Sequence, residues 1–341
     1  MRAHRILVLA AALLLTTIVN AQAPGYHIVN TYALGGTGSW DYLTFDSQGH
    51  RVFIGRQNRA MVVDATTGKL LGEIPGLMGA HGVAVVSATN HGFATSGNDG
   101  AVVMFDLKTL QVLGRTPAAE DADAIFFDPA SKHVFTMNGD SKSSSVIDPS
   151  SGKNIGTIPL GGKPEFGVSA GNGKLYANIT DTAEVVEIDA AKMAVTRRWS
   201  VTPCAASTGL SIDVAHSRLF SVCRSKHLAV SDIVAGKLVT TLPIGAGVDA
   251  SEFDPATQLI FASNNDGTMT VVHEDTPDTY TVVETVQTGA GAKTMTLDPT
   301  THRVYLGTAS YGPVDPNATG RGRGRAPMVP DSFKLLALDR K

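Results

Sequence analysis

Short apolar strands alternate with polar turns along the chain, and they do so in a repeating order. In each unit an apolar strand leads through a turn into a second strand with an aromatic residue, and a polar loop then leads into a third strand that ends in aspartate. The aromatic residue returns every 40–44 positions, at Phe53, Phe93, Phe135, Tyr176, Phe220, Phe261 and Tyr305. Repeats of this length built from short strands predict a β-propeller, in which each repeat forms one small sheet.

The turn that follows the third strand explains its aspartate. Within residues 64–69, the carboxylate of Asp64 can accept hydrogen bonds from backbone N–H groups, and Gly68 can take the left-handed conformation that closes the turn. The other repeats carry aspartate at the same place, at Asp106, Asp148, Asp189, Asp232, Asp275 and Asp339. We therefore interpret these aspartates as structural, although they resemble a catalytic series.

Seven repeats predict one all-β domain, a seven-bladed β-propeller over residues 24–341. The blades are expected at residues 40–80, 81–121, 122–163, 164–206, 207–248, 249–292 and 293–341. The seventh repeat has only three strands, and residues 26–34 have the pattern of a fourth. We expect this N-terminal strand to complete the last blade, which removes exposed strand edges. A closed ring needs no partner to cover its edges, so we expect a monomer.

Two segments depart from the repeat. Residues 1–23 carry Arg2 and Arg5, an apolar run at 6–18 and small residues for cleavage, which predicts a secretory signal peptide and a periplasmic or secreted protein. The run is shorter than the roughly 20 residues that span a bilayer, and no longer apolar run follows it, so no membrane span is expected. Residues 311–330 are rich in Pro, Gly and Arg, which predicts a flexible loop in blade seven.

The charge balance argues against a nucleic-acid partner. Of the 28 Lys and Arg residues, Arg2 and Arg5 lie in the predicted signal peptide, which leaves 26 against 31 Asp and Glu. Binding to a phosphate backbone requires clustered basic residues. The Arg-Gly run at residues 321–325 could contact nucleic acid, but its loop holds one aromatic residue and the protein is expected to be exported.

The repeats resemble the YVTN-type repeats of YncE-like exported bacterial propellers. The resemblance rests on Phe135-Thr136-Met137-Asn138, on Phe261-Ala262-Ser263-Asn264, and on the turn at residues 64–69, and it covers the whole predicted propeller. Two repeats depart from the pattern: one places Asn178 a position early, and the one that contains Tyr305 has no asparagine there. The resemblance implies a periplasmic seven-bladed propeller, and it implies no common chemistry.

The sequence contains two cysteines, Cys204 and Cys223. Cys204 precedes an inner strand, and Cys223 ends the antiparallel strand that follows, so both are expected near the same rim. Export to an oxidising compartment allows a disulfide between them. The alternative is two separate thiols.

The residues most suited to bind a ligand lie at the predicted central funnel. The loops that lead into each inner strand and those between second and third strands should line it, and they vary in charge from repeat to repeat. The candidate ligand-binding residues are Trp40, Asp41, His81, Asp123, Glu165, Asp249, Lys293, Arg56 and Arg224.

Two function classes fit these residues. In the first, the protein is a non-enzymatic exported scaffold whose polar funnel binds a protein, a peptide or a small molecule, and no cofactor is required. In the second, His81, Asp123, Glu165 and Asp249 hold a divalent metal that activates water in a lactonase-like or lyase-like enzyme. We favour the binding scaffold, because solvated charges commonly line a propeller channel.

Overall fold

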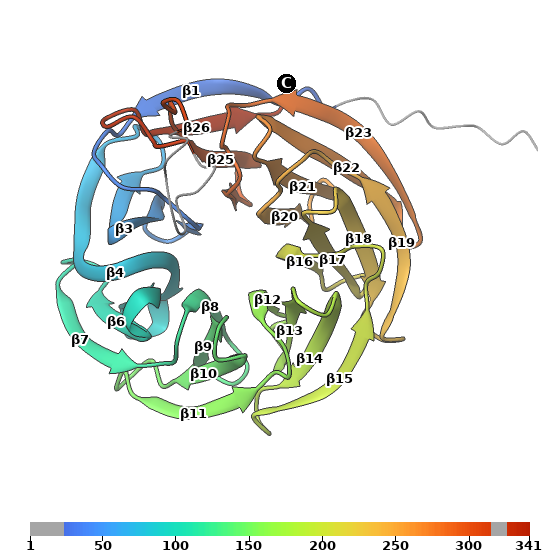
Figure 1. Ribbon diagram of the computed structural model, residues 1–341, viewed down its shortest axis with the longest axis horizontal. Coiled ribbons are helices and arrows are strands. Elements are labelled where there is room, and N and C mark those ends of the chain that lie inside the picture. The colour runs from blue at the N-terminus through green and yellow to red at the C-terminus, as the bar shows by residue number, and fades with distance from the viewer. Residues whose placement is uncertain (1–23, 315–325) are drawn as a thin grey trace, which may run out of the picture.

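The structure is a computed structural model that describes residues 24–314 and 326–341. Its strands form sheets arranged around a central axis, like blades around a hub (Figure 1). The predicted signal peptide at residues 1–23 and the Arg-Gly run at residues 321–325 lie outside the described residues. None of the helices in the described part is long and apolar enough to cross a membrane.

Five of the sheets have four antiparallel strands each. Three of them follow one another along the chain. The first contains β8 (Ala122–Asp128), β9 (His133–Asn138), β10 (Ser143–Ile147) and β11 (Asn154–Pro159), and the second contains β12 (Pro164–Ser169), β13 (Lys174–Ile179), β14 (Glu184–Asp189) and β15 (Ala194–Ser200). The third contains β16 (Ser207–Asp213), β17 (Arg218–Cys223), β18 (His227–Asp232) and β19 (Lys237–Pro243). The fourth contains β20 (Ala250–Asp254), β21 (Leu259–Asn264), β22 (Thr268–Thr276) and β23 (Thr279–Gln287).

The fifth four-stranded sheet joins the two ends of the described chain. It contains β24 (Met295–Asp298), β25 (Arg303–Thr308), β26 (Lys334–Asp339) and, outermost, β1 (His27–Ala33). Strand β1 pairs antiparallel with β26, with Thr31 opposite Leu336. The expectation that the N-terminal strand completes the last blade is therefore confirmed.

The prediction of seven blades is wrong, because the strands form six sheets. With each sheet counted as one blade, the propeller is six-bladed. The sixth sheet has six strands: β2 (Leu43–Asp46), β3 (Arg51–Asp64), β4 (Leu70–Val86), β5 (His91–Ser96), β6 (Ala101–Asp106) and β7 (Val112–Pro117). It spans the residues that the repeat pattern divides into the first two blades.

Strand β4 is the physical reason for the joined sheet. Its first half pairs with β3 and its second half with β5, and the pairing of Gln57 with Ala80 continues the ladder between the two halves. Figure 1 shows β4 passing from the outer rim of the ring to its centre. The residues expected to form a loop between two blades therefore remain part of a strand.

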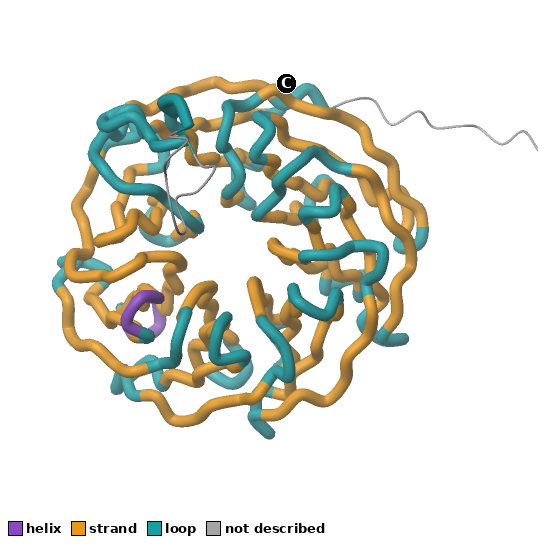
Figure 2. Tube along the Cα trace, viewed as in Figure 1, coloured by secondary structure: helices purple, strands orange, loops and turns teal. Residues whose placement is uncertain are grey.

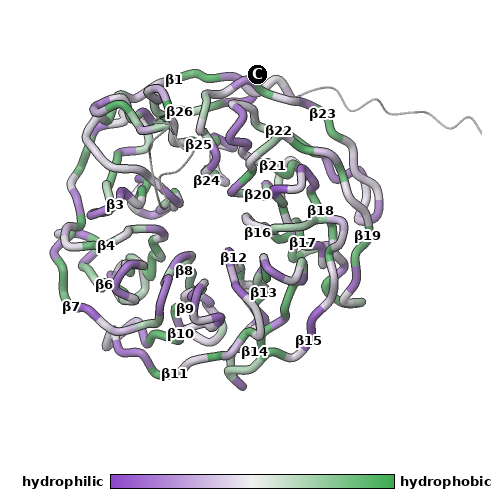
Figure 3. The backbone as a smooth tube through the Cα atoms, in the orientation of Figure 1, coloured by the Kyte–Doolittle hydropathy of each residue, from purple (hydrophilic) through white to green (hydrophobic). Residues whose placement is uncertain are grey.

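The repeated aromatic residues are all buried, which explains their regular spacing. Those at the seven positions are at most 3% exposed, and each packs in a cluster of aliphatic side chains. Burial of one such side chain contributes about 1.5–3 kcal/mol to the free energy of unfolding. Hydrophobic and hydrophilic segments alternate around the whole ring (Figure 3).

Turns at the strand ends have the predicted chemistry. Asp64 accepts hydrogen bonds from the backbone N–H groups of Thr66 and Thr67, at 3.1 and 2.7 Å, and Gly68 has a φ of 69°. Asp339 departs from this role, because it forms a paired hydrogen bond with the guanidinium of Arg303. Helical structure in the described part is limited to two short 3-10 turns, η1 (Ser87–Thr89) and η2 (Gly97–Asp99) (Figure 2).

Cys204 and Cys223 form a disulfide, with their Cα atoms 5.4 Å apart. Both residues are fully buried. The bond ties the loop before β16 to the end of β17, so it fixes the approach of the chain to this inner strand.

Candidate ligand-binding site at the channel mouth

Each of the six sheets contributes a charged side chain to one mouth of the central channel. The contributing residues lie just before an inner strand, at its beginning, or at the end of the second strand. Because the inner strands begin at the same end of the ring, residues far apart in sequence meet there. The contributing side chains are Asp41, His81, Asp123, Glu165, Arg224, Asp249 and Lys293.

His81 joins two carboxylates on one side of the mouth. Its Nδ1 lies 2.6 Å from an Oδ atom of Asp41 and 3.2 Å from one of Asp123. The imidazole fits because residue 97 is glycine: a Cβ there would lie 2.7 Å from Nε2 of His81. Nε2 therefore packs close to Gly97, and Nδ1 is the nitrogen that contacts the two carboxylates.

The other side of the mouth has a second chain of ion pairs. Asp249 lies between two cations, with one carboxylate oxygen 3.0 Å from Arg224 and the other in contact with Nζ of Lys293. Arg224 also approaches Glu165 at 3.5 Å, and Lys293 approaches Asp41 at 3.9 Å. Lys293 thus connects the two sides, and all seven side chains form one chain of ion pairs.

Burial and mutual charge shift the ionisation of the His81 group. Burial alone would lower the pKa of His81, but the hydrogen bond that its ring donates to Asp41 and the charge of Asp123 outweigh it and raise that pKa to about 9. Burial favours the neutral form of Asp123 and raises its pKa well above the usual range. At neutral pH, His81 is therefore protonated and donates from Nδ1.

The carboxylates of the mouth differ in charge because their neighbours differ. Burial would raise the pKa of Asp41, but the Lys293 charge and the His81 hydrogen bond outweigh it and lower that pKa. Burial, together with the Asp249 charge, raises the pKa of Glu165 to about 7, against the opposing effect of Arg224. Asp41 is therefore a fixed anion, whereas Glu165 titrates near neutrality.

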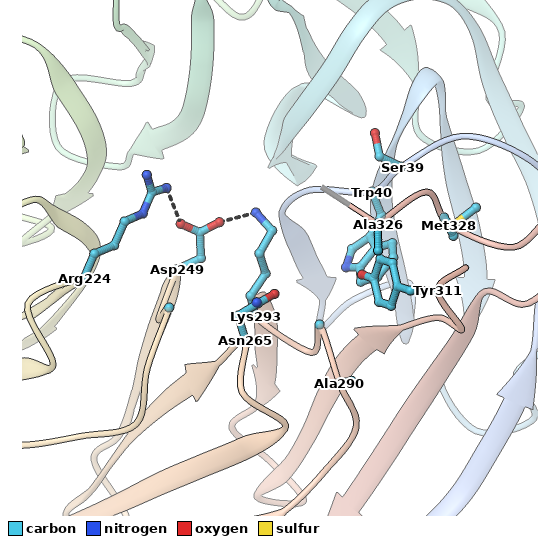
Figure 4. A pocket seen from close by; sticks show the side chains of 12 residues that line it. Ser39, Trp40, Arg224, Asp249, Asn265, Ala290, Lys293, Tyr311, Ala326 and Met328 are labelled. Carbon is cyan, nitrogen blue, oxygen red and sulfur yellow. Dashed lines mark hydrogen bonds and ion pairs between the residues drawn. The ribbon is translucent and has the colours of Figure 1, made fainter. Parts of the chain in front are cut away.

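A cavity of about 680 Å³ opens beside Lys293. Arg224, Asp249 and Lys293 form its charged wall, and Trp40, Tyr311 and Met328 form its apolar wall. Figure 4 shows the charged side chains on one side of the cavity and the two aromatic rings on the other. A cavity of this volume accommodates a small organic molecule.

Local structure holds the apolar wall in place. Trp40 is 7% exposed and packs against Phe333, with ring centroids 5.0 Å apart, and Tyr311 lies 6.4 Å from Trp40. Gly291 has a φ of 79°, and a Cβ at this position would lie 2.3 Å from the Tyr311 hydroxyl. Glycine is therefore required here both for the turn before β24 and for the close approach of Tyr311.

Eight of the nine candidate residues lie at this mouth, and Arg56 does not. Its side chain is fully buried, and its guanidinium donates hydrogen bonds to the carbonyl oxygens of Gly35, Thr37 and Gly38. It also lies 4.0 Å above the ring of Phe333. Arg56 therefore fastens the segment that follows β1.

The structure adds three residues to the nine candidates. Tyr311 and Met328 come from the two described ends of the loop at residues 311–330, and Asn265 comes from the loop after β21. The presence of an aromatic residue in an otherwise Pro- and Gly-rich loop was the available signal for Tyr311. Asn265 lies in one of the loops that were expected to line the funnel, and Met328 had no such signal.

The four residues proposed from the sequence as metal ligands do not form one group in the structure. Glu165 and Asp249 contact Arg224, and Asp249 also contacts Lys293, so both carboxylates already have cationic partners. Within the described residues, Asp41, His81 and Asp123 instead form a group whose possible ligand atoms all lie within 4.8 Å of one another. This trio is the part of the mouth that could hold a divalent cation.

The opposite mouth of the channel is different in character. A cavity of about 630 Å³ there is lined largely by aliphatic and phenylalanine side chains, together with Glu252. Burial alone raises the pKa of Glu252 to about 8. The two mouths therefore offer different environments, one rich in ion pairs and the other lined by apolar and hydroxyl side chains with one carboxyl group.

Comparison with known proteins supports the fold and goes no further. No family model matches the sequence, and no curated protein matches it. Among solved structures, the chain is similar to hydrazine synthase from Kuenenia stuttgartiensis, with a TM-score of 0.70 over 86% of this chain and 96% of that chain. The two chains are 16% identical, so the likeness shows a shared β-propeller fold and does not show a shared function.

Proposed function

We propose that this protein is an exported, YncE-like propeller with YVTN-type repeats, and that it binds a small organic anion at the charged mouth without chemical conversion. The observation that carries the proposal is the cavity with Lys293 and Arg224 on one wall and Trp40 and Tyr311 on the other. Arg224 and Lys293 share the carboxylate of Asp249 there, and their other carboxylate contacts, to Glu165 and Asp41, are long, at 3.5 and 3.9 Å, so both cations can still pair with an anionic ligand. Export is supported by the disulfide between Cys204 and Cys223.

The shape of the cavity suggests a ligand with an anionic group and a flat apolar part. Arg224 is the accessible cation, since its side chain is 56% exposed. A planar guanidinium binds a carboxylate through two parallel hydrogen bonds. The aromatic wall would cover the apolar part, because Tyr311 is 40% exposed at the rim of the cavity.

Calorimetric titration with matched probes tests this proposal. Naphthalene-2-carboxylate should bind the wild-type protein more tightly than the neutral 2-naphthylmethanol. Lys293→Met removes one of the two cations that share Asp249, so it should weaken this preference, with a loss of at least about tenfold in carboxylate affinity. Tyr311→Ala should weaken both probes, because both use the aromatic wall.

Lys192→Met provides the matched control. Lys192 also pairs with an aspartate, Asp189, but it lies on the surface with a side chain that is 71% exposed. This variant should bind both probes as the wild type does. Equal affinity of the wild type for the two probes, or unchanged binding by both mouth variants, would contradict the proposal.

A second candidate function, a metal-assisted lactonase or lyase, is favoured by the trio of Asp41, His81 and Asp123. A divalent metal held there would activate water for attack on an ester. The test is hydrolysis of dihydrocoumarin with added Zn²⁺, Mn²⁺ or Ca²⁺. Metal-dependent turnover that is lost in His81→Ala supports this candidate, and no turnover with any of the three metals rejects it.

A further inference from the structure

A buried glutamate occupies a core position of the repeat. Glu274 lies next to the aspartate of the third strand, where the other repeats place Val63, Phe105, Ile147, Ile188, Ser231 and Leu338. Its side chain is 1% exposed. Burial of a carboxylate at a position that is mostly apolar is costly unless a cation or several hydrogen bonds satisfy it.

Glu274 meets two further metal-ligand side chains at the boundary between two blades. Asp213 is the last residue of β16 and His216 lies in the turn that follows, whereas Glu274 comes from β22 of the next sheet. Nδ1 of His216 lies 2.6 Å from Oδ2 of Asp213 and 3.4 Å from Oε1 of Glu274. One ligand atom of each residue lies within 4.8 Å of the other two.

An unpartnered oxygen points to a missing ligand in this group. Oε2 of Glu274 is buried and has no N–H or O–H donor among the described residues when both acidic groups are ionised, because the neighbouring carboxyl group of Asp213 can donate to Glu274 only in its protonated form. Oε1 has two long contacts, 3.4 Å from Nδ1 of His216 and 3.5 Å from the hydroxyl of Tyr280. The side chain of Asp213 is 2% exposed, so two buried carboxyl groups face each other with one imidazole between them.

We propose that Asp213, His216 and Glu274 form a binding site for a divalent transition metal, with Zn²⁺ as the best fit, that links two blades. Two carboxylate oxygens and one imidazole nitrogen suit Zn²⁺, which binds such ligands at about 2.0–2.2 Å in tetrahedral geometry. Water takes the fourth position, since His216 is 41% exposed and gives access from solvent. The site is independent of the ligand proposed for the channel mouth.

The distances require one small adjustment. Tetrahedral ligands at these bond lengths lie about 3.3 Å apart, and the separation of Nδ1 and Oε1 is already 3.4 Å. The separation of Nδ1 and Oδ2 is 2.6 Å, a hydrogen-bond distance, and must widen by roughly 0.7 Å as the metal replaces the proton on Nδ1. The exposed imidazole of His216 can make this movement, because few atoms confine it.

The chain contains a matched control pair. Nδ1 of His302 lies 2.8 Å from an oxygen of buried Asp254, which is the counterpart of Asp213 in the next sheet. In the last sheet of the ring, which contains β26, the position equivalent to Glu274 is occupied by Leu338. Among the described residues, no third metal ligand completes a group with Asp254 and His302. This aspartate–histidine pair should therefore not retain metal.

The test is Zn²⁺ binding by the tag-free protein without residues 1–23, first treated with EDTA and then analysed by equilibrium dialysis with metal analysis. The wild type should bind one equivalent of Zn²⁺ tightly at this site. His216→Ala should lose this equivalent, and Glu274→Gln should weaken its affinity by at least about tenfold. His302→Ala and His81→Ala should keep it, which separates the site from the channel mouth.

Thermal unfolding gives a second readout that does not depend on stoichiometry. Zn²⁺ should raise the melting temperature of the wild type and not that of His216→Ala. Glu274→Leu restores the apolar residue of other repeats, so it should fold and be insensitive to Zn²⁺. Equal Zn²⁺ binding by the wild type and His216→Ala, or loss of the equivalent in His302→Ala, would overturn the proposal.

Discussion

Nδ1 of His81 lies 2.6 Å from a carboxylate oxygen of Asp41, although the two residues are 40 positions apart in sequence. Asp41 also lies 3.9 Å from Nζ of Lys293, which comes from the far end of the chain. One partly buried carboxylate thus holds two cations at the channel mouth, and the ion-pair chain depends on it.

Replacement of this carboxylate should destabilise the protein. Asp41→Asn removes the negative charge that pairs with protonated His81 and with Lys293. The free energy of unfolding at pH 7 should therefore fall by about 2–4 kcal/mol. Urea denaturation measures the change. Glu184→Gln removes one partner of the more exposed pair with Arg198 and should cost less than about 1 kcal/mol. Equal losses in the two variants would refute the special role of Asp41.

Tyr26 should contribute much of the stability of the ring closure. Its ring packs edge-on against Phe261 at 5.1 Å, and its hydroxyl donates a hydrogen bond to the carbonyl of His302 at 3.0 Å. Tyr26→Ala should therefore cost about 3–5 kcal/mol, the range for a large buried aromatic residue. Tyr32→Ala is the control in the same segment: Tyr32 is less buried, so its loss should be smaller. Thermal and urea unfolding would show the difference.

The disulfide should stabilise the protein by restricting the unfolded chain. The two cysteines are 19 residues apart, and closure of a loop of this length contributes about 3 kcal/mol in the chain-entropy model. The double variant with Cys204→Ala and Cys223→Ala should lose about this amount. Dithiothreitol should lower the unfolding free energy of the wild type and leave that of the double variant unchanged; an effect on both would implicate something other than this bond.

The stability of the protein should fall as the pH rises, in part because of Glu252. Burial raises the pKa of this carboxyl group from 4.5 to about 8, so between these values the folded state binds more protons than the unfolded state. Its contribution is complete below pH 4.5 and is lost as the pH rises through 8. Glu252→Gln cannot titrate, so it should gain about 1–3 kcal/mol relative to the wild type between pH 5 and pH 8.

Urea denaturation across this pH range provides the measurement. Glu120→Gln, at an exposed residue, is the control and should leave the profile of the wild type unaltered. A constant difference between Glu252→Gln and the wild type from pH 5 to pH 8 would show that Glu252 is not the titrating group.

Some features of the site could be predicted from the sequence and others could not. Asp41, His81 and Lys293 stand at equivalent places before or within inner strands, and a propeller brings equivalent places together, so their gathering follows from the repeat. The partners of each charge do not follow, because they depend on side-chain reach across the channel. Arg56 belongs, like Arg224, to the segment between the second and third strands of a repeat, but it is buried, since the carbonyl groups of residues 35, 37 and 38 lie within its reach.

The sequence by itself determined that this is a β-propeller whose last blade is completed by the N-terminal strand, because the period of buried aromatic residues and the strand pattern are local properties of the chain. Only the tertiary structure decided that β3, β4 and β5 join two repeats into one six-stranded sheet, because continuous hydrogen bonding depends on the path of the backbone and not on residue type. The tertiary structure likewise brought Glu274 to Asp213 and His216, since contacts between neighbouring blades follow from their packing and leave no periodic signal in the sequence.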